Sequence, residues 1–421
     1  MEKVITVSLQ KQKDTDAAVK ASMDELEELV DTAGGEVVEA YTQKKDHADP
    51  ATFVGKGKAA ELGERVRELK IETVVFDDEL KPSQQQNLEE IIPAKIVDRT
   101  RLILDIFAQR ARTREGILQV ELAQLSYMLP RITERFGRFE QQTGGIGSRG
   151  PGERKLEVDQ RRIRERMTHL KKQIEKIGSE RSLQRQVRRS VPMPQVALVG
   201  YTNAGKSTLL NALLRLSAGR AQAKDEVYAD DKLFATLDPT TRRVRLPSGR
   251  IILFSDTVGF IRKLPTQLVA AFRATLEEVA TADLLIHVVD ASDPAWREQA
   301  QTVTAILEEL KMGQLPRVTA YNKIDLLSKP SLGLIKQQDG VFISAGKERH
   351  LEDLLKAVEG RLSEQWIDKE LLFSFKEGSR LARVHEFMEV VSQEMTETGY
   401  KVHVRSHPTT LAQWLKNDLS E

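Results

Sequence analysis

Apolar runs and helical patterns alternate along the first hundred residues of the chain. The runs 4–9, 37–41 and 74–76 have the length of strands, and the apolar spacing over residues 16–32 is that of an amphipathic helix. A sequence that alternates in this way predicts a small α/β domain, which we expect over residues 1–110. Asp77, Asp78 and Glu79, directly after the third strand, could bind a cation, but a solvated strand end is the favoured expectation.

Two helical patterns follow, and a glycine-rich segment separates them. In the first, Leu118, Leu122, Leu125 and Leu129 recur at four, three and four residues, and this helix is expected to end at Pro130. In the second, apolar residues over 156–177 recur at intervals of three, four or seven, which is typical of a seam between paired helices. We expect a long antiparallel helical hairpin over residues 111–190, with its tip between the two helices.

A second alternation of strand and helix patterns begins at Gln195 and runs to about Ser363. It predicts an α/β domain with a parallel sheet over residues 191–365. The remaining residues, 366–421, are expected to form a small C-terminal α/β domain. Within it we predict a helix over 380–395 and a strand over 401–405.

Composition and charge narrow the class of protein. The chain has 421 residues, 40% hydrophobic and 30% charged, with no apolar run long enough to cross a bilayer, and we expect a cytoplasmic monomer of several domains. The absence of cysteine excludes disulfides and thiolate metal sites. The net charge is only +1, but basic residues concentrate in the second hairpin helix, notably Arg161, Arg162, Arg164, Arg166, Lys171, Lys172 and Lys176.

A phosphate-binding loop is predicted where the apolar run 196–199 ends. The residues that follow are Gly200, Tyr201, Thr202, Asn203, Ala204, Gly205, Lys206 and Ser207, and a helical pattern begins at Thr208. This order of strand, glycine-rich loop and helix is the one that a Walker A motif requires. Glycine lets backbone N–H groups approach phosphate, Lys206 supplies a positive charge, and the Ser207 hydroxyl suits Mg²⁺. We expect these residues to bind a nucleoside triphosphate with Mg²⁺.

Three further motifs each follow a predicted strand. They are Asp256, Thr257, Val258 and Gly259; Asn322, Lys323, Ile324 and Asp325; and Ser344, Ala345 and Gly346. A carboxylate at Asp325 can accept hydrogen bonds from the N1 and N2 donors of guanine, and adenine lacks both donors. Ligands of open α/β sheets bind at the carboxyl ends of the strands, so the four motifs together predict one guanine-nucleotide site.

Taken in order, these motifs resemble those of the translation-factor-related GTPases. The resemblance implies a P-loop GTPase domain that converts GTP and water to GDP and phosphate. It also implies a switch I threonine within Phe234, Ala235, Thr236, Leu237 and Asp238, and we assign Thr236 as the second Mg²⁺ ligand beside Ser207. Thr240 and Thr241 are the competing candidates.

The rest of the chain resembles one family closely, the HflX GTPases. The motifs that carry this resemblance are Phe53-Val54-Gly55-Lys56-Gly57-Lys58, Asp98-Arg99-Thr100, Ile106-Phe107-Ala108 and Gly144-Gly145-Ile146-Gly147-Ser148-Arg149-Gly150-Pro151-Gly152-Glu153. One departure is Arg154-Lys155, where the family leads us to expect Thr-Gln. The resemblance implies that the protein binds the large ribosomal subunit and its rRNA and splits or rescues stalled ribosomes under stress.

The predicted hairpin tip carries side chains that suit RNA. Arg138 and Arg149 can pair with phosphate, Phe136 and Phe139 can stack on bases, and Gly147 and Gly150 let the backbone approach closely. A solvated basic helix with a flexible loop would contain the same residue types. The family resemblance favours contact with RNA.

The source of hydrolysis is less evident than the nucleotide site. Phe260 follows Gly259, where many GTPases carry a glutamine that orients water, and a phenyl ring cannot replace it. Ribosome-stimulated hydrolysis is therefore expected.

Asn203 resembles the asparagine that helps other glutamine-less GTPases bind K⁺, which makes K⁺ a second candidate cofactor. A role in loop geometry is the alternative. The competing function is a GTP-gated RNA-binding scaffold with negligible hydrolysis. His287 is expected to be a core residue with satisfied hydrogen bonds.

Overall fold

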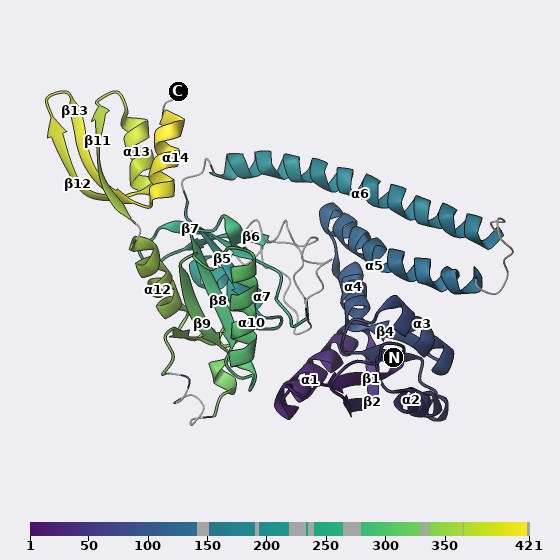
Figure 1. Cartoon of the computed structure of the whole chain (residues 1–421). Coiled ribbons are helices and arrows are strands. Elements are labelled where there is room, and N and C mark those ends of the chain that lie inside the picture. Colours follow the sequence, from purple (N-terminus) through teal and green to yellow (C-terminus); the bar gives the residue numbers. More distant parts are fainter. Residues whose placement is uncertain are drawn as a thin grey trace. The chain divides into compact units, whose positions relative to one another are not determined.

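The computed structural model describes residues 1–140, 151–189, 193–218, 233–234, 240–263, 279–328, 333, 335, 337–364 and 366–418 of the chain. These residues form two compact units, which Figure 1 colours along the sequence. The first unit contains residues 1–177 together with 232–237 and 262–273. The second contains residues 178–231, 238–261 and 274–421.

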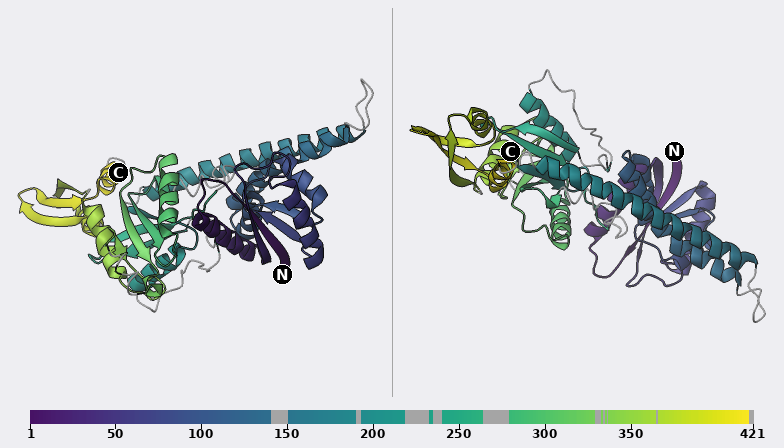
Figure 2. Two further views of the ribbon diagram at one scale, coloured as in Figure 1. Left: turned by 60° about the horizontal axis from the view of Figure 1, so that its bottom comes forward. Right: turned by 90° about the horizontal axis from the view of Figure 1, so that it is seen from above.

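A four-stranded parallel sheet forms the N-terminal part of the first unit (Figure 2). Its strands, in the order β2-β1-β3-β4, are β1 (Glu2–Gln10), β2 (Gly35–Lys44), β3 (Thr73–Phe76) and β4 (Lys95–Asp98). The helices are α1 (Asp16–Ala33), α2 (Lys56–Leu69), α3 (Pro82–Ile91) and α4 (Arg99–Arg110). Strand β3 is buried along its whole length, as expected of a parallel strand between two layers of helices. The predicted N-terminal α/β fold is confirmed.

Two long helices follow, α5 (Arg114–Glu140) and α6 (Pro151–Arg189), and they run side by side in both figures. Arg166 of α6 donates to both carboxylate oxygens of Glu121 of α5, at 2.7 and 2.8 Å. Leu170, in the middle of the predicted seam, is fully buried. The apolar spacing thus identified the face along which α6 packs.

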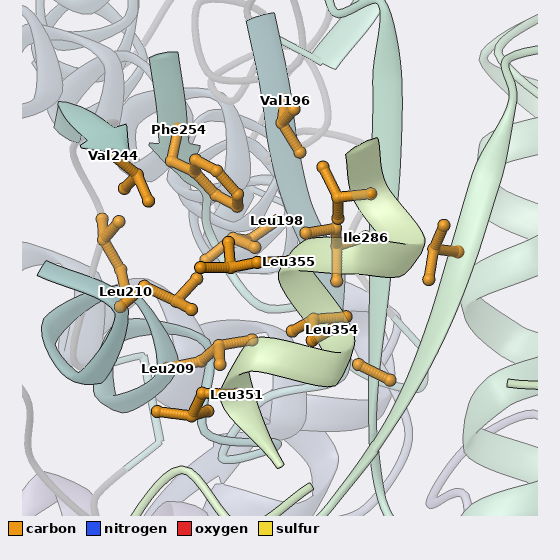
Figure 3. Packing of buried hydrophobic residues seen from close by; sticks show 14 of the residues in the cluster. Val196, Leu198, Leu209, Leu210, Val244, Phe254, Ile286, Leu351, Leu354 and Leu355 are labelled. Atoms are coloured by element: carbon orange, nitrogen blue, oxygen red, sulfur yellow. The ribbon is translucent and has the colours of Figure 1, made fainter. Parts of the chain in front are cut away.

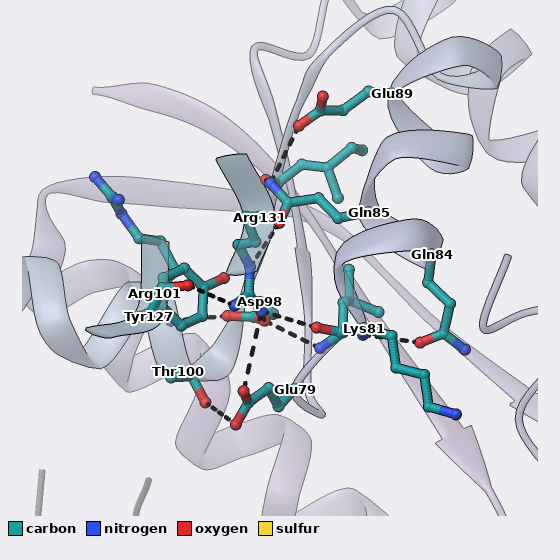
Figure 4. A network of polar contacts seen from close by, with 12 residues as sticks. Glu79, Lys81, Gln84, Gln85, Glu89, Asp98, Thr100, Arg101, Tyr127 and Arg131 are labelled. Carbon is teal, nitrogen blue, oxygen red and sulfur yellow. Dashed lines mark hydrogen bonds and ion pairs between the residues drawn. The ribbon is translucent and has the colours of Figure 1, made fainter. Parts of the chain in front are cut away.

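Helix α5 does not end at Pro130, as we predicted, but continues through it. Proline removes a helical N–H and costs about 3 kcal/mol inside a helix. The next residue, Arg131, offsets this cost through contacts outside the helix: its guanidinium donates to Asp98 Oδ2 at 3.1 Å, to the Leu80 carbonyl at 2.8 Å and to Gln85 Oε1 at 3.1 Å (Figure 4). These contacts span 33 to 51 residues, so the local pattern at Pro130 gave no sign of them.

A six-stranded sheet organises the second unit. Its strands are β5 (Gln195–Gly200), β6 (Thr240–Arg245), β7 (Ile251–Asp256), β8 (Leu284–Asp290), β9 (Arg317–Asn322) and β10 (Val341–Phe342), in the order β10-β9-β8-β5-β7-β6. Only β6, at one edge, is antiparallel to its neighbour. Strands β5, β7, β9 and β10 therefore end at one edge of the sheet, which brings the motifs that follow them together.

Helices cover this sheet and supply its core. They are α7 (Lys206–Ala218), α10 (Trp296–Glu309) and α12 (Leu351–Ser363), with a 3₁₀ turn, η1 (Ile324–Leu326). Leu198 and Ile286 of the sheet pack against Leu209 of α7 and Leu354 of α12, and all four side chains are fully buried (Figure 3). Burial of each side chain of this size contributes about 1.5–3 kcal/mol. This core fixes the position of β5, at whose end the phosphate-binding loop begins.

The C-terminal residues form a small antiparallel sheet with two helices. Its elements are β11 (Ile367–Ser374), α13 (Gly378–Phe387), β12 (Glu389–Thr396), β13 (Gly399–Ser406) and α14 (Pro408–Asp418), and the strand order is β11-β13-β12. The helix that we predicted over 380–395 is correct only to Phe387, because the following residues pair with β13 instead. Strand formation there depends on a partner strand, which the helical spacing does not report.

Candidate functional site

The predicted phosphate loop lies between the end of β5 and the start of α7, and two of its glycines cannot be replaced without movement. At Gly200 a β-carbon would collide with the Val288 carbonyl oxygen of the adjacent strand β8. At Gly205 the backbone is left-handed, with φ at 88°, and a β-carbon would collide with Asn322 Nδ2. The loop is therefore packed tightly against β8 on one side and against Asn322 on the other.

Lys206 is held inside this loop. Its side chain donates to the carbonyl oxygens of Gly200 at 3.2 Å and of Tyr201 at 2.8 Å, and the residue is only 6% exposed. Burial lowers the pKa of Lys206 to about 8, and the nearby Asp256 opposes that shift. The ammonium group is thus positioned and poorly solvated, so an anionic phosphate beside it would restore a counter-charge.

Ser207 and Asp256 supply oxygen atoms of the kind that Mg²⁺ prefers. The Ser207 hydroxyl donates to Asp256 Oδ2 at 2.6 Å, and Asp256 is fully buried. A buried carboxylate next to a hydroxyl at the phosphate loop fits a Mg²⁺ site in which Ser207 binds directly and Asp256 through water. Thr236, the other predicted ligand, lies outside the described residues, as do Ala235, Leu237 and Asp238.

The segment after Asp256 crosses the phosphate loop. The Thr257 hydroxyl donates to the Leu198 carbonyl at 2.6 Å. Phe260 then pairs with the loop through its backbone: its N–H donates to the Gly200 carbonyl at 3.0 Å, and its own carbonyl accepts the Thr202 N–H at 2.7 Å. The Phe260 side chain is 5% exposed, so it packs in the interior. Phe260 serves packing and backbone pairing in this structure.

At the other end of the site, Asn322 links the phosphate loop to the Ser344-Ala345-Gly346 segment. Its Nδ2 donates to the Ala204 carbonyl at 2.9 Å, and its Oδ1 accepts the Ala345 N–H at 2.9 Å. The Ser344 hydroxyl donates to Asp325 Oδ1 at 2.5 Å, which orients a carboxylate that is otherwise exposed. The four predicted motifs thus meet at one edge of the sheet, in an arrangement that suits guanine at one end and phosphates at the other.

One participant at this edge was missed. Asp290, the last residue of β8, makes an ion pair of 2.8 Å with Lys323, whose backbone is left-handed with φ at 61°. The signal in the sequence was present, because Asp290 follows a buried apolar run in the same way as Asp256 does. The ion pair restricts the Lys323 side chain next to the residues expected to bind guanine.

Phe234, from the segment expected to hold the switch I threonine, and Lys263, three residues after Phe260, belong to the first compact unit. Phe234, only 2% exposed, packs against Phe107 with ring centroids 4.5 Å apart.

Lys263 makes ion pairs with Asp77 at 2.6 Å and with Asp78 at 2.8 Å. Asp77 is fully buried and also accepts hydrogen bonds from Arg99 and Ser22, both at 2.7 Å. The prediction of a solvated strand end is therefore wrong for Asp77, whose charge is balanced by two cations that come from distant parts of the chain.

His287 of β8 is a core residue, as predicted, but its hydrogen bonding is incomplete. It is 5% exposed, and its Nε2 has no hydrogen-bond partner among the described residues. Burial lowers the pKa of His287 to about 4, and the charges of Arg317 and Lys206 lower it further. The imidazole is consequently neutral at physiological pH.

The predicted RNA-contacting residues are described only in part. Phe136, Arg138 and Phe139 lie in the last turns of α5, whereas Gly147, Arg149 and Gly150 fall outside the described residues. The side chains of α6 are described over 157–179, and its basic residues there, Arg161, Arg162, Arg164, Arg166, Lys171, Lys172 and Lys176, are all exposed. This surface is basic and accessible along one helix.

Neither a carboxylate–histidine metal cluster nor a membrane-spanning helix is found in the described residues. Within them no cluster of three or more histidine, aspartate or glutamate side chains could hold a metal ion. No described helix has the length and apolar character needed to cross a membrane.

Comparison with known proteins assigns the family. Residues 20–108 match the family of GTP-binding GTPase N-terminal regions, residues 110–188 match the GTP-binding GTPase middle region, and residues 195–323 match the 50S ribosome-binding GTPase family. The GTPase HflX of Caldanaerobacter subterraneus is 47% identical over 381 residues, which cover 90% of this chain and 86% of that protein. The GTPase HflX of Escherichia coli is 42% identical over 381 residues, which cover 90% of this chain and 87% of that protein.

A solved structure is also similar. It is a GTP-binding protein from Sulfolobus solfataricus in complex with GDP, with a TM-score of 0.45, 24% identity, and coverage of 86% of this chain and 98% of that one. The two HflX relatives cover 90% of this chain at 47% and 42% identity, and their GTPase name agrees with the guanine-nucleotide motifs found at the sheet edge. The chain is a GTP-binding and GTP-hydrolysing protein that belongs to the HflX family of GTPases.

Proposed function

We propose that this GTPase binds the large ribosomal subunit through its helical hairpin and splits or rescues stalled ribosomes under stress. The observation that carries the proposal is the basic surface of α6, where seven arginine and lysine side chains are exposed over residues 157–179 against four acidic ones. Such a surface attracts RNA phosphates, and its contribution falls as salt rises. The family description of residues 195–323 as a 50S ribosome-binding GTPase supports the same target.

In this proposal the nucleotide occupies the sheet edge described above. The loop from Gly200 to Thr208 binds the phosphates, and Asp325 binds the guanine N1 and N2 donors. Ser207 and Thr236 hold Mg²⁺, and Asp256 acts through water. Mg²⁺ would neutralise charge on the β- and γ-phosphates.

The hairpin is the part of the chain to test first. A variant in which Gly144 to Gly152 is shortened should bind GTP as the parent does but fail to separate ribosomes. A second variant, Lys171→Glu with Lys172→Glu, should weaken binding to large subunits. Lys13→Glu with Lys20→Glu makes the same change in charge on an exposed part of the N-terminal domain and serves as its control. Full splitting by the shortened variant contradicts the proposed role of the tip.

Hydrolysis separates this proposal from a GTP-gated RNA-binding scaffold. The proposal requires that large subunits accelerate single-turnover GTP hydrolysis, because Phe260 offers no side chain that orients water. A scaffold would bind subunits in the presence of GTP and show the same slow turnover with and without them. Equal rates in the two conditions would therefore favour the scaffold.

Asn203 carries the proposal of a K⁺ site. Its backbone is left-handed, with φ at 58°, a conformation that asparagine tolerates better than most residues. Loop geometry alone therefore explains an asparagine here, and the cation must be tested directly. A K⁺ site requires faster turnover in KCl than in NaCl, and identical turnover in both salts removes it.

A further inference from the structure

Thr202 is the one described residue of the phosphate loop whose side-chain hydroxyl is buried without a hydrogen-bond partner. It is 7% exposed, and no acceptor or donor among the described residues reaches its Oγ1. A buried hydroxyl without a partner costs about 1–3 kcal/mol. Valine has the same shape as threonine and avoids that cost, so a packing role alone does not explain the hydroxyl.

The side chain lies beside Lys206 and Gly259, the two residues expected to meet the γ-phosphate. A β-carbon placed on Gly259 would lie 2.7 Å from Thr202 Cα, 3.0 Å from Thr202 Cγ2 and 2.9 Å from Lys206 Nζ. Thr202, Gly259 and Lys206 thus converge on one point. In P-loop GTPases the lysine reaches the β- and γ-phosphates, and the glycine N–H at the end of the D-x-x-G motif meets the γ-phosphate. The Thr202 side chain is therefore next to the expected position of the γ-phosphate; its methyl carbon Cγ2 is the side-chain atom nearest Gly259, and its hydroxyl is bonded to the same β-carbon.

Phe260, at the position where many GTPases carry the glutamine that orients water, offers no group to the attacking water. The Phe260 side chain is buried, and its backbone N–H and carbonyl are bonded to Gly200 and to the Thr202 N–H. The same pairing holds the Thr202 backbone in place, whereas its side-chain hydroxyl has no partner among the described residues. Ser207 and Thr257 also carry hydroxyls here, but these donate to Asp256 and to the Leu198 carbonyl.

We propose that the Thr202 hydroxyl is a catalytic group for GTP hydrolysis, which contacts the γ-phosphate and the attacking water in place of the missing glutamine. The water oxygen forms a bond to the γ-phosphorus, and the bond from that phosphorus to the β,γ-bridging oxygen breaks. GDP leaves with the electron pair of the broken bond. The water contributes its hydroxyl to the phosphate product, and its other proton passes to a phosphate oxygen or to solvent. Thr202 accepts a hydrogen bond from the water and donates one to a γ-phosphate oxygen, so it ends the reaction unchanged.

In this role Thr202 affects the rate of GTP hydrolysis and has little effect on the affinity for GDP. GDP has no γ-phosphate, so its affinity should not depend on the hydroxyl. Removal of one positioned hydrogen-bonding group from a transition state commonly reduces the rate by about 10²–10³-fold. For an intrinsically slow GTPase we expect a loss of at least about tenfold. The inference concerns the GTPase reaction itself and does not depend on the ribosomal proposal.

The test uses the full chain without ribosomal subunits and compares three variants, Thr202→Val, Thr202→Ala and Thr202→Ser. Single-turnover GTP hydrolysis is measured at saturating protein, GDP affinity by fluorescence titration, and thermal unfolding by calorimetry. Thr304→Val, on α10, makes the same chemical change at a hydroxyl that donates to the Ala300 carbonyl, and it serves as the control. Thr304→Val should hydrolyse GTP at the parental rate.

Thr202→Val is expected to lose at least about tenfold in rate, with GDP affinity within about twofold and no fall in its unfolding temperature. Thr202→Ser, which keeps the hydroxyl, should recover most of the rate. Parental hydrolysis by Thr202→Val, together with a higher unfolding temperature, would identify the hydroxyl as an uncompensated core group and overturn the proposal. A loss of rate in Thr202→Ser as large as that in Thr202→Val would also overturn it. If Thr202→Val fails to bind GDP, the same outcomes apply to Thr202→Ala.

Discussion

The affinity of this protein for guanine nucleotide should depend on pH through Lys206. In the free protein burial lowers the pKa of this lysine to about 8. A bound phosphate supplies negative charge beside the ammonium group and raises its pKa again. Well below pH 8 the lysine is already charged in the free protein, so nucleotide binding takes up almost no proton. As the pH rises past 8 the free protein loses that proton. Binding must then restore it, so the apparent affinity falls.

The magnitude follows from the fraction of protein that carries the charge. A group with a pKa of about 8 is about 90% protonated at pH 7 and about 24% protonated at pH 8.5. GDP affinity should therefore weaken about fourfold between these values, which corresponds to about 0.8 kcal/mol. At pH 8 about half a proton should be taken up for each GDP bound.

Calorimetry measures that proton directly. GDP is titrated at pH 8 into the protein in two buffers of different ionisation enthalpy, and the difference in heat gives the number of protons transferred. The phosphates of GDP are already ionised at this pH because their last pKa lies near 6. Lys206→Arg, which stays charged, is the control and should show no uptake. Equal heats for the parent protein in both buffers would show that GDP binding does not protonate Lys206.

Three further predictions concern the core residue His287 and two residues of the nucleotide site. His287 is buried with a lowered pKa, whereas in the unfolded chain it binds a proton near pH 6.5, so the free energy of unfolding should decrease as the pH is lowered. Acidification from pH 7 to 5 should cost about 2 kcal/mol in urea unfolding, and His287→Leu should abolish that loss. Asn322→Ala leaves the Ala204 carbonyl and the Ala345 N–H buried without partners, which costs about 1–3 kcal/mol for each group. The variant should therefore bind GDP at least about tenfold more weakly in a fluorescence titration and unfold at a lower temperature. Parental affinity would contradict the bridging role. Asp325→Asn should lose GDP affinity and gain affinity for xanthosine diphosphate, and an absence of that gain would remove the assignment of guanine recognition.

The nucleotide-site geometry was predictable because its signals are local. Each of the four motifs directly follows an apolar run, and in a parallel sheet the carboxyl ends of the strands share one edge. Spacing therefore predicted that Lys206, Asp256, Asn322 and Ser344 would lie near one another, without any knowledge of the strand order. The hairpin seam was predictable for a similar reason, since Leu170 lies on a face that repeats along a single helix.

Features that depend on distant contacts were not predictable in this way. Helix α5 passes through Pro130 because Arg131 reaches Asp98, and Asp77 is buried because Arg99 and Lys263 balance its charge. The segment after Phe387 has apolar residues that fit a helix as well as a strand, and only its pairing with β13 decides between them. The approach of Thr202 to Gly259 likewise joins residues 57 positions apart, which no periodicity reports.

The most direct test of the proposed function is co-sedimentation of the full chain with purified large ribosomal subunits. The measurement compares a non-hydrolysable GTP analogue with GDP at physiological salt, after nucleotide binding has been verified for both. The protein should pellet with the subunits when the analogue is bound and stay in the supernatant with GDP. Protein that binds the analogue but remains in the supernatant in both conditions would contradict it.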